Sequence, residues 1–154
     1  MRRASWIGVG LVFASGMLLS IGAGCGTVDP GSEDGAGVLD YDVFKTAVQP
    51  VLDQRGCSNG GCHYRDKSNP SSGGPGGSFR VFDCANDSCT DDQLRADFDS
   101  ASGMSDLADP AGSKLLRKPL AEGAGGIQHL GGDIFSNAAD SDYLTILGWI
   151  QSPL

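Results

Sequence analysis

The apolar residues of this chain form one long block at the start and short periodic stripes after it. The block covers residues 6–24 without a charged side chain and follows arginines at positions 2 and 3. A basic start, an apolar middle and the small residues Gly22-Ala23-Gly24 before a cysteine are typical of an export signal. Because Cys25 follows these small residues directly, we predict a lipoprotein signal peptide over residues 1–24, with Cys25 as the lipidated first residue of the mature chain.

The alternative for this block is an uncleaved membrane-spanning helix, since about 20 apolar residues are enough to cross a bilayer. The glycines of this block weigh against a stable spanning helix. Gly22 weighs against a lipoprotein signal, because a branched residue usually stands three positions before a lipidated cysteine. Both alternatives place the rest of the chain outside the cytoplasm. We expect a bacterial cell-envelope protein, held to a membrane by its lipid and located in the periplasm or at the outer-membrane surface.

Two stripes predict helices at the two ends of a domain over residues 40–154. Residues 40–54 carry apolar side chains at helical spacing, with Asp40 as an N-cap and Pro50 as an interruption. Residues 141–151 carry the clearest stripe in the chain and close it. The pattern therefore begins and ends with helix.

The middle of the domain shows shorter signals. Residues 90–101 open on Thr-Asp-Asp-Gln, a capping box that predicts a helix. Residues 113–118 predict one further helical turn, and residues 79–82 alternate like a brief strand. Residues 68–78 consist of Gly, Ser, Pro and Asn and predict a loop. Together these segments predict a small, mostly α-helical domain with long glycine-rich loops.

Composition adds a tether and a thin core to this picture. Residues 25–39 have almost no large apolar side chains, so burial cannot offset the entropy of ordering them, and we expect a flexible tether. The chain contains 24 glycines among its 154 residues, which leaves few large side chains to build a core. A cofactor or disulfides would supply the missing stability.

The charge of the chain restricts its partners. Nineteen Asp and Glu residues stand against eleven Lys and Arg residues, two of which leave with the signal peptide. Such an acidic surface disfavours binding to nucleic acid through phosphates. It suits solubility, or docking on a basic redox partner protein.

The clearest chemical signal is the sequence Cys57-Ser-Asn-Gly-Gly-Cys62-His63. Two cysteines followed directly by histidine are the layout that attaches a c-type haem, with two thioether bonds and one axial imidazole. The usual spacing is two residues, and here it is four. The alternatives are a disulfide between Cys57 and Cys62, or a zinc site made by the four later cysteines with His63.

The second cysteine pair, Cys84 and Cys89, has no following histidine. In an exported chain this spacing favours a disulfide within one loop. The acidic residues around it do not have the alternating spacing of a calcium loop.

Several phrases of the chain resemble the cytochrome-c-like domains of bacterial surface proteins. Phe44-Lys-Thr-Ala-Val-Gln-Pro-Val-Leu precedes the cysteine motif, and Asp109-Pro-Ala-Gly-Ser-Lys-Leu-Leu-Arg-Lys-Pro follows it. His129-Leu-Gly-Gly and Asp142-Tyr-x-x-Ile-x-x-Trp-Ile complete the order over residues 41–151. The resemblance implies a fold in which the first and last helices pack together, with one covalent haem c between them and the loops.

The sixth iron ligand distinguishes the possible functions. Only His63 and His129 are histidines, and His129 lies in a phrase that resembles the family, so we expect it to be the second axial ligand, with Met104 as the alternative. Two filled axial positions predict a membrane-tethered monohaem cytochrome that carries electrons between redox partner proteins. The alternatives are a haemless, disulfide-stapled surface lipoprotein that binds other proteins, and a haem peroxidase with an open iron position.

Overall fold

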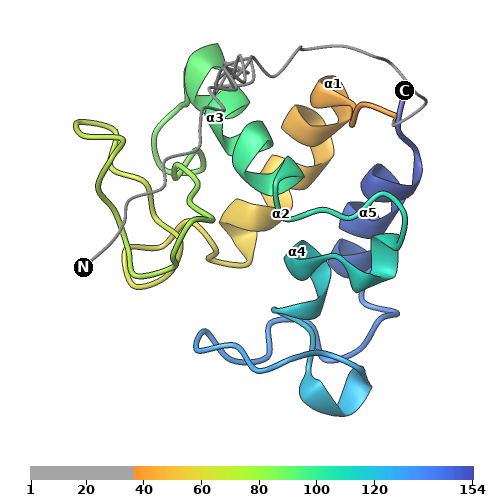
Figure 1. The fold of residues 1–154 in the computed structure, drawn as a ribbon. Coiled ribbons are helices and arrows are strands. Elements are labelled where there is room, and N and C mark those ends of the chain that lie inside the picture. The colour runs from red at the N-terminus through yellow and green to blue at the C-terminus, as the bar shows by residue number, and fades with distance from the viewer. Residues whose placement is uncertain (1–36) are drawn as a thin grey trace, which may run out of the picture. The chain divides into compact units, whose positions relative to one another are not determined.

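The computed structural model describes residues 37–154, so the predicted signal peptide, Cys25 and most of the predicted tether lie outside the described residues. Within residues 37–154 the structure is helix-rich and has no β-strand, only isolated bridges, as the predicted mostly α class requires (Figure 1). No helix in this range is long and apolar enough to cross a membrane. In chain order the elements are α1 (Tyr41–Val43), the π-helix η1 (Phe44–Val48), α2 (Gln49–Gln54), α3 (Asp91–Ser102), the 3-10 helix η2 (Pro110–Gly112), α4 (Lys114–Arg117), the 3-10 helix η3 (Glu122–Ala124) and α5 (Ser141–Gln151).

The predicted helix over residues 40–54 forms, but its middle turn is wider than an α-helical turn. Asp40 caps it as expected, because its carboxylate accepts hydrogen bonds from two backbone N–H groups of the first turn at 2.8 and 3.0 Å. The π-helix η1 then separates α1 from α2, and the N–H of Gln49 bonds to the carbonyl of Phe44. Pro50 has no N–H and so cannot continue the regular pattern of backbone hydrogen bonds of an α-helix. The irregular turn lies directly before it.

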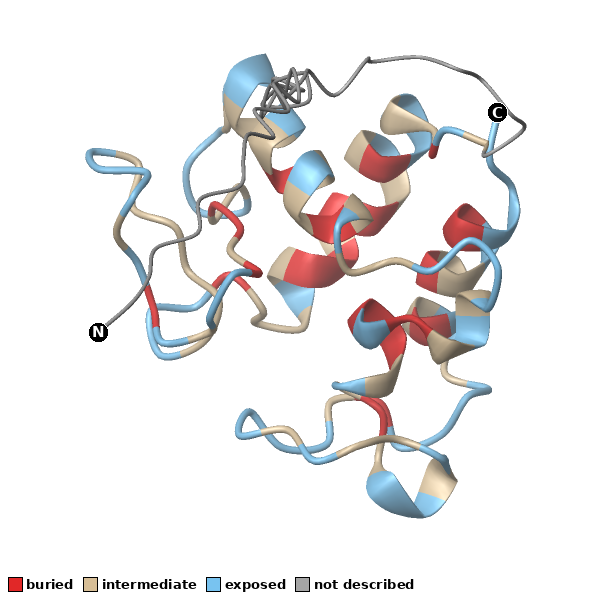
Figure 2. Cartoon of the chain, in the orientation of Figure 1, coloured by how far each residue is buried: buried red, intermediate tan, exposed pale blue. Residues whose placement is uncertain are grey.

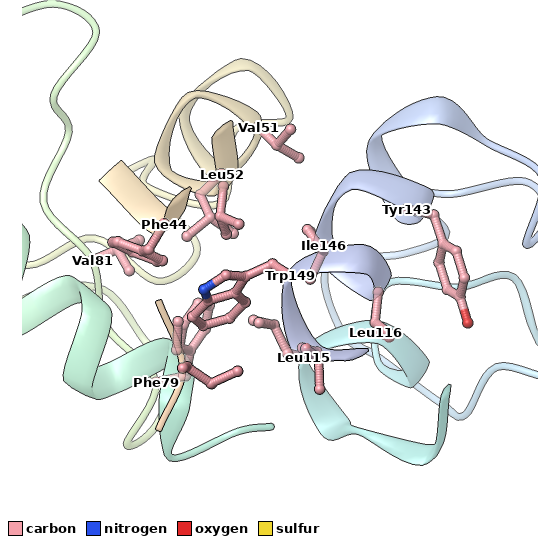
Figure 3. Close-up of a cluster of buried hydrophobic side chains, with 14 of the residues drawn as sticks. Phe44, Val51, Leu52, Phe79, Val81, Leu115, Leu116, Tyr143, Ile146 and Trp149 are labelled. Atoms are coloured by element: carbon pink, nitrogen blue, oxygen red, sulfur yellow. The ribbon is translucent and has the colours of Figure 1, made fainter. Parts of the chain in front are cut away.

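The first and last helical segments pack together, as the sequence predicts. The ring centroids of Phe44 in η1 and Trp149 in α5 are 5.5 Å apart. The indole N–H of Trp149 also donates to the carbonyl of Asp40 at 2.9 Å. Figure 3 shows side chains of η1, α2, α4 and α5 meeting in one cluster. Since replacing a buried aromatic residue by Ala typically costs about 3–5 kcal/mol, this cluster holds the two ends of the domain together.

Helix α3 begins where the capping box predicts. The N–H of Gln93 donates to the Thr90 hydroxyl at 3.3 Å, and the N–H of Thr90 donates to the Gln93 side chain at 2.9 Å. Phe98 of this helix packs edge-on against Phe44, with ring centroids 5.6 Å apart. The helix therefore covers the side of η1 that α5 leaves open.

The predicted strand over residues 79–82 is wrong. Its only pairing is one bridge between Val81 and Tyr64, closed by hydrogen bonds of Val81 with His63 and Arg65 at 2.8 Å each. One residue further on, the N–H of Phe82 donates to a side chain of α3 and not to a neighbouring strand. The alternation of apolar residues reflects burial in this extended segment, which finds no ladder to join.

Figure 2 shows buried residues on the inward sides of the helices, while the long loops combine exposed and intermediate residues with a few buried ones. Two of these loops carry the predicted site residues. The first joins α2 to α3 and the second joins α4 to α5. The helices thus provide a rigid support from which both loops project.

Candidate functional site

The loop that carries the cysteine motif folds back on the end of α2. The N–H of Cys57 bonds to the carbonyl of Leu52, and the N–H of His63 bonds to the carbonyl of Cys57, both at 2.9 Å. Ser58, only 2 % exposed, donates its hydroxyl to Asp53 of α2 at 2.9 Å. The four residues between the two cysteines therefore form ordered turns that bring the start and end of the motif together.

The two cysteine pairs differ in the structure. Cys57 and Cys62 are separate, half-buried thiols, whereas Cys84 and Cys89 form a disulfide. The disulfide leaves the zinc alternative without two of its four thiolates. Burial, and then the neighbouring Cys62, raises the pKa of Cys57 to about 11. This thiol is therefore uncharged at neutral pH, unlike the activated nucleophile of a thiol enzyme.

His63 is held in one orientation by the segment that follows the glycine-rich loop. Its Nδ1 lies 2.9 Å from the carbonyl oxygen of Phe79, and the two rings are 4.7 Å apart. A carbonyl only accepts hydrogen bonds, so Nδ1 carries the proton and Nε2 keeps its lone pair. A Cβ at Gly76 would collide with the imidazole, so glycine is needed at this close approach.

His129 is held in the same way by its own loop. Its Nδ1 lies 3.2 Å from the carbonyl oxygen of Gly132, which has a φ of +77° that favours glycine. A bridge between Leu120 and Phe135 closes the base of this loop. Here too the carbonyl assigns the proton to Nδ1 and leaves the lone pair on Nε2.

The structure brings the two histidines together. Their ring centroids are 5.9 Å apart and their planes differ by 9°. The arrangement is a stacked one, whereas imidazoles that share one metal direct a ring nitrogen at it from different sides. Simple aromatic pairs have similar separations, but packing alone does not require both Nδ1 atoms to be fixed on carbonyls. The structure thus places two imidazole rings side by side, and the thiols of Cys57 and Cys62 lie on the same loop as His63.

Met104, the alternative sixth ligand, has other neighbours. Its side chain packs partly buried against the hydrophobic core, and its carbonyl accepts a hydrogen bond from Leu115 at 3.1 Å. It lines a shallow cavity with Leu107 and Lys114. Of the two proposed ligands, His129 is the one whose ring the structure pairs with that of His63.

Sequence analysis missed Arg55, which ties the two site loops together. From the end of α2 its Nε donates to Asp142 at 2.6 Å and its Nη2 to Asp140 at 2.8 Å. Its Nη1 also reaches the carbonyl of Ile134 at 3.4 Å. The hydrogen bond to Asp142 raises the pKa of Arg55, so the guanidinium stays charged. These partners are 79 to 87 residues away along the chain, so no local sequence pattern marks the contact.

Two surface cavities of the described part, each of about 360 Å³, lie away from the histidine pair. One, of about 360 Å³, lies beside the Cys84–Cys89 disulfide, and the other is the cavity next to Met104. The identification of the site therefore rests on the histidines and the thiols and not on a cavity.

Comparison with known proteins adds no relative to this picture. No protein-family model matches the chain, and neither a curated protein nor a solved structure is significantly similar to it.

Proposed function

We propose that this chain is a monohaem c-type cytochrome that carries single electrons at the cell envelope. The observation that carries the proposal is the near-parallel pair His63 and His129, 5.9 Å apart, with both Nδ1 atoms bonded to backbone carbonyls. A bound haem would supply a one-electron change between ferric and ferrous iron. Cys57 and Cys62 would hold it covalently, and His63 and His129 would bind its iron.

The protein's own part is to keep these ligands in place. The carbonyls of Phe79 and Gly132 fix the imidazole protons and ring orientations, as second-shell acceptors do for metal-bound histidine. Arg55 joins the end of α2 to the start of α5 and so holds the two loops at a constant separation. A rigid site of this kind suits electron transfer, because little has to move when the charge of the site changes.

The pairing of His129 with His63 favours a carrier over a peroxidase, which needs an open iron position. The separate thiols of Cys57 and Cys62 likewise favour haem attachment over the haemless alternative, which predicts that they form a disulfide. The proposed location is the bacterial cell envelope, with a lipid on Cys25 as the anchor and redox proteins as partners.

The test is the absorption spectrum of the exported full chain from cells with a cytochrome c maturation system. We expect a c-type haem band on reduction that remains with the protein after acid–acetone extraction. His129→Ala is expected to lose the low-spin spectrum of two strong axial ligands, while the exposed neighbour variant Gln128→Ala keeps it. A colourless protein with Cys57 and Cys62 oxidised would overturn the proposal in favour of a disulfide-stapled binding module.

A further inference from the structure

A buried polar network lies beside the proposed haem site and has no part in holding the ligands. Asp97 of α3 is 0 % exposed, and both of its carboxylate oxygens lie 3.0 Å from the N–H of Phe82. Gln49 of α2 is 2 % exposed and donates to the carbonyl of the same residue at 3.3 Å. A fully buried carboxylate with one backbone donor is costly unless it is neutralised.

The same network contains an unsatisfied acceptor. Gln49 Nε2 also donates to Asp53 at 3.3 Å, but Gln49 Oε1 is buried and has no hydrogen-bond partner. The Gln49 side chain also lies against the Asp97 carboxyl, where its hydrogen bond favours the charged form. A proton on Asp97 removes the charge that burial disfavours. Burial accordingly raises the pKa of Asp97 to about 7.

Two other charged groups face Asp97, one from each neighbouring element. Arg65, from the segment after the haem motif, favours the carboxylate, whereas Asp53 of α2 disfavours it. Asp53 is itself half-buried, and its own pKa is raised by burial. Asp53 and Asp97 therefore share one nearby cation, Arg65. A single proton on one of the two acids makes the net charge of these three side chains zero.

The network is joined to the haem ligand through one short segment. His63 Nδ1 bonds to the carbonyl of Phe79 and the His63 carbonyl accepts from Val81, while Asp97 holds the N–H of Phe82. The three steps from residue 79 to residue 82 span at most about 10 Å. Asp97 and the His63 imidazole are therefore bonded to the same four-residue segment of folded chain.

Resting on the haem function proposed above, we propose that Asp97 binds a proton when the chain accepts an electron and releases it when the electron leaves. A reduced partner protein supplies the electron to the ferric iron, and solvent supplies the proton to the Asp97 carboxylate. Solvent reaches the network at the cavity of about 360 Å³ that Gln49 and Asp53 line. Adding negative charge at the haem raises the proton affinity of a nearby carboxylate, which makes the two events mutually favourable.

The test compares the midpoint potential with pH in three proteins: wild type, Asp97→Asn and the exposed α3 control Asp99→Asn. Asparagine keeps an acceptor for the Phe82 N–H and stays uncharged, so it imitates protonated Asp97 without titrating. We expect the potential of the wild type and of the control to fall between about pH 6 and 8. The limit is about 59 mV per tenfold change in proton activity for a one-electron couple. Asp97→Asn should lose this slope.

A second measurement needs no variant. The infrared difference spectrum between reduced and oxidised wild type should contain a protonated-carboxyl band that appears on reduction. A flat wild-type profile, an unchanged slope in Asp97→Asn, or no such band would each overturn proton coupling. A protein without covalent haem would instead overturn the electron-carrier function, and the presence or absence of the haem band separates these two failures.

Discussion

Ionisation of Asp97 should make the folded chain less stable as the pH rises, and Asp97→Asn should remove that loss. Burial raises the pKa of this carboxyl from 3.8 to about 7, which at about 1.4 kcal/mol per pKa unit corresponds to about 4 kcal/mol. The folded state binds the proton more tightly than the unfolded state. Stability from this group is therefore complete below the unfolded pKa of 3.8 and is lost as the pH rises through about 7.

The assay is urea unfolding of wild type, Asp97→Asn and Asp99→Asn, followed by circular dichroism at two pH values. From about pH 5 to about pH 8 the stability of Asp97→Asn relative to wild type should improve by about 2–3 kcal/mol. Comparing variants at each pH cancels the opposite contributions of acids such as Asp83 and Asp91, whose pKa values are lowered by hydrogen bonds. The exposed control should follow the wild type. A difference between Asp97→Asn and wild type that is the same at both pH values would refute the reasoning.

Two further predictions concern the proposed haem loop. In haem-free exported protein at neutral pH, Cys57 should react with iodoacetamide far more slowly in the folded chain than in urea. Folding raises its pKa from 9.0 to about 11, which lowers the thiolate fraction about 100-fold; equal rates by mass spectrometry would contradict this. Gly76→Ala should displace His63 and reduce the yield of low-spin haem protein, whereas Gly123→Ala, where a Cβ meets no atom within 4 Å, should leave the spectrum unchanged; equal spectra for both variants would show that the close approach at residue 76 is not needed.

Local signals in the sequence predict most of the helices. The Asp40 cap, the Thr90 capping box and the closing stripe over residues 141–151 all depend on residues within about one or two turns of each other, and each helix forms there. The π-turn lies before Pro50, which has no backbone N–H, and it contains the buried Phe44. The spacing of apolar residues in the sequence does not reveal this wider turn. The wrong strand prediction over residues 79–82 is likewise a limit of local patterns. The alternation of apolar residues indicates which side chains are buried, but it does not show whether a partner strand exists.

The site was predictable only in part. The spacing of Cys57, Cys62 and His63 marks the motif, and His129 is the one other imidazole in the chain. The sequence does not show that the two rings are nearly parallel, nor that Arg55 joins their loops, because these contacts link distant segments. Asp97 stands at helical spacing from Leu94 and Ala101, beside the apolar stripe, but its contact with Phe82 depends on the path of residues 79–82, which local spacing does not show.

The described chain begins and ends at one place. The N–H of Leu154 bonds to the carbonyl of Val38 at 2.8 Å, and Trp149 reaches Asp40 just beside it. In Figure 1 this point lies far from the loop between α4 and α5 that carries His129. A fusion partner attached after Leu154 would therefore lie away from the loop that carries His129 and leave the proposed histidine site uncovered.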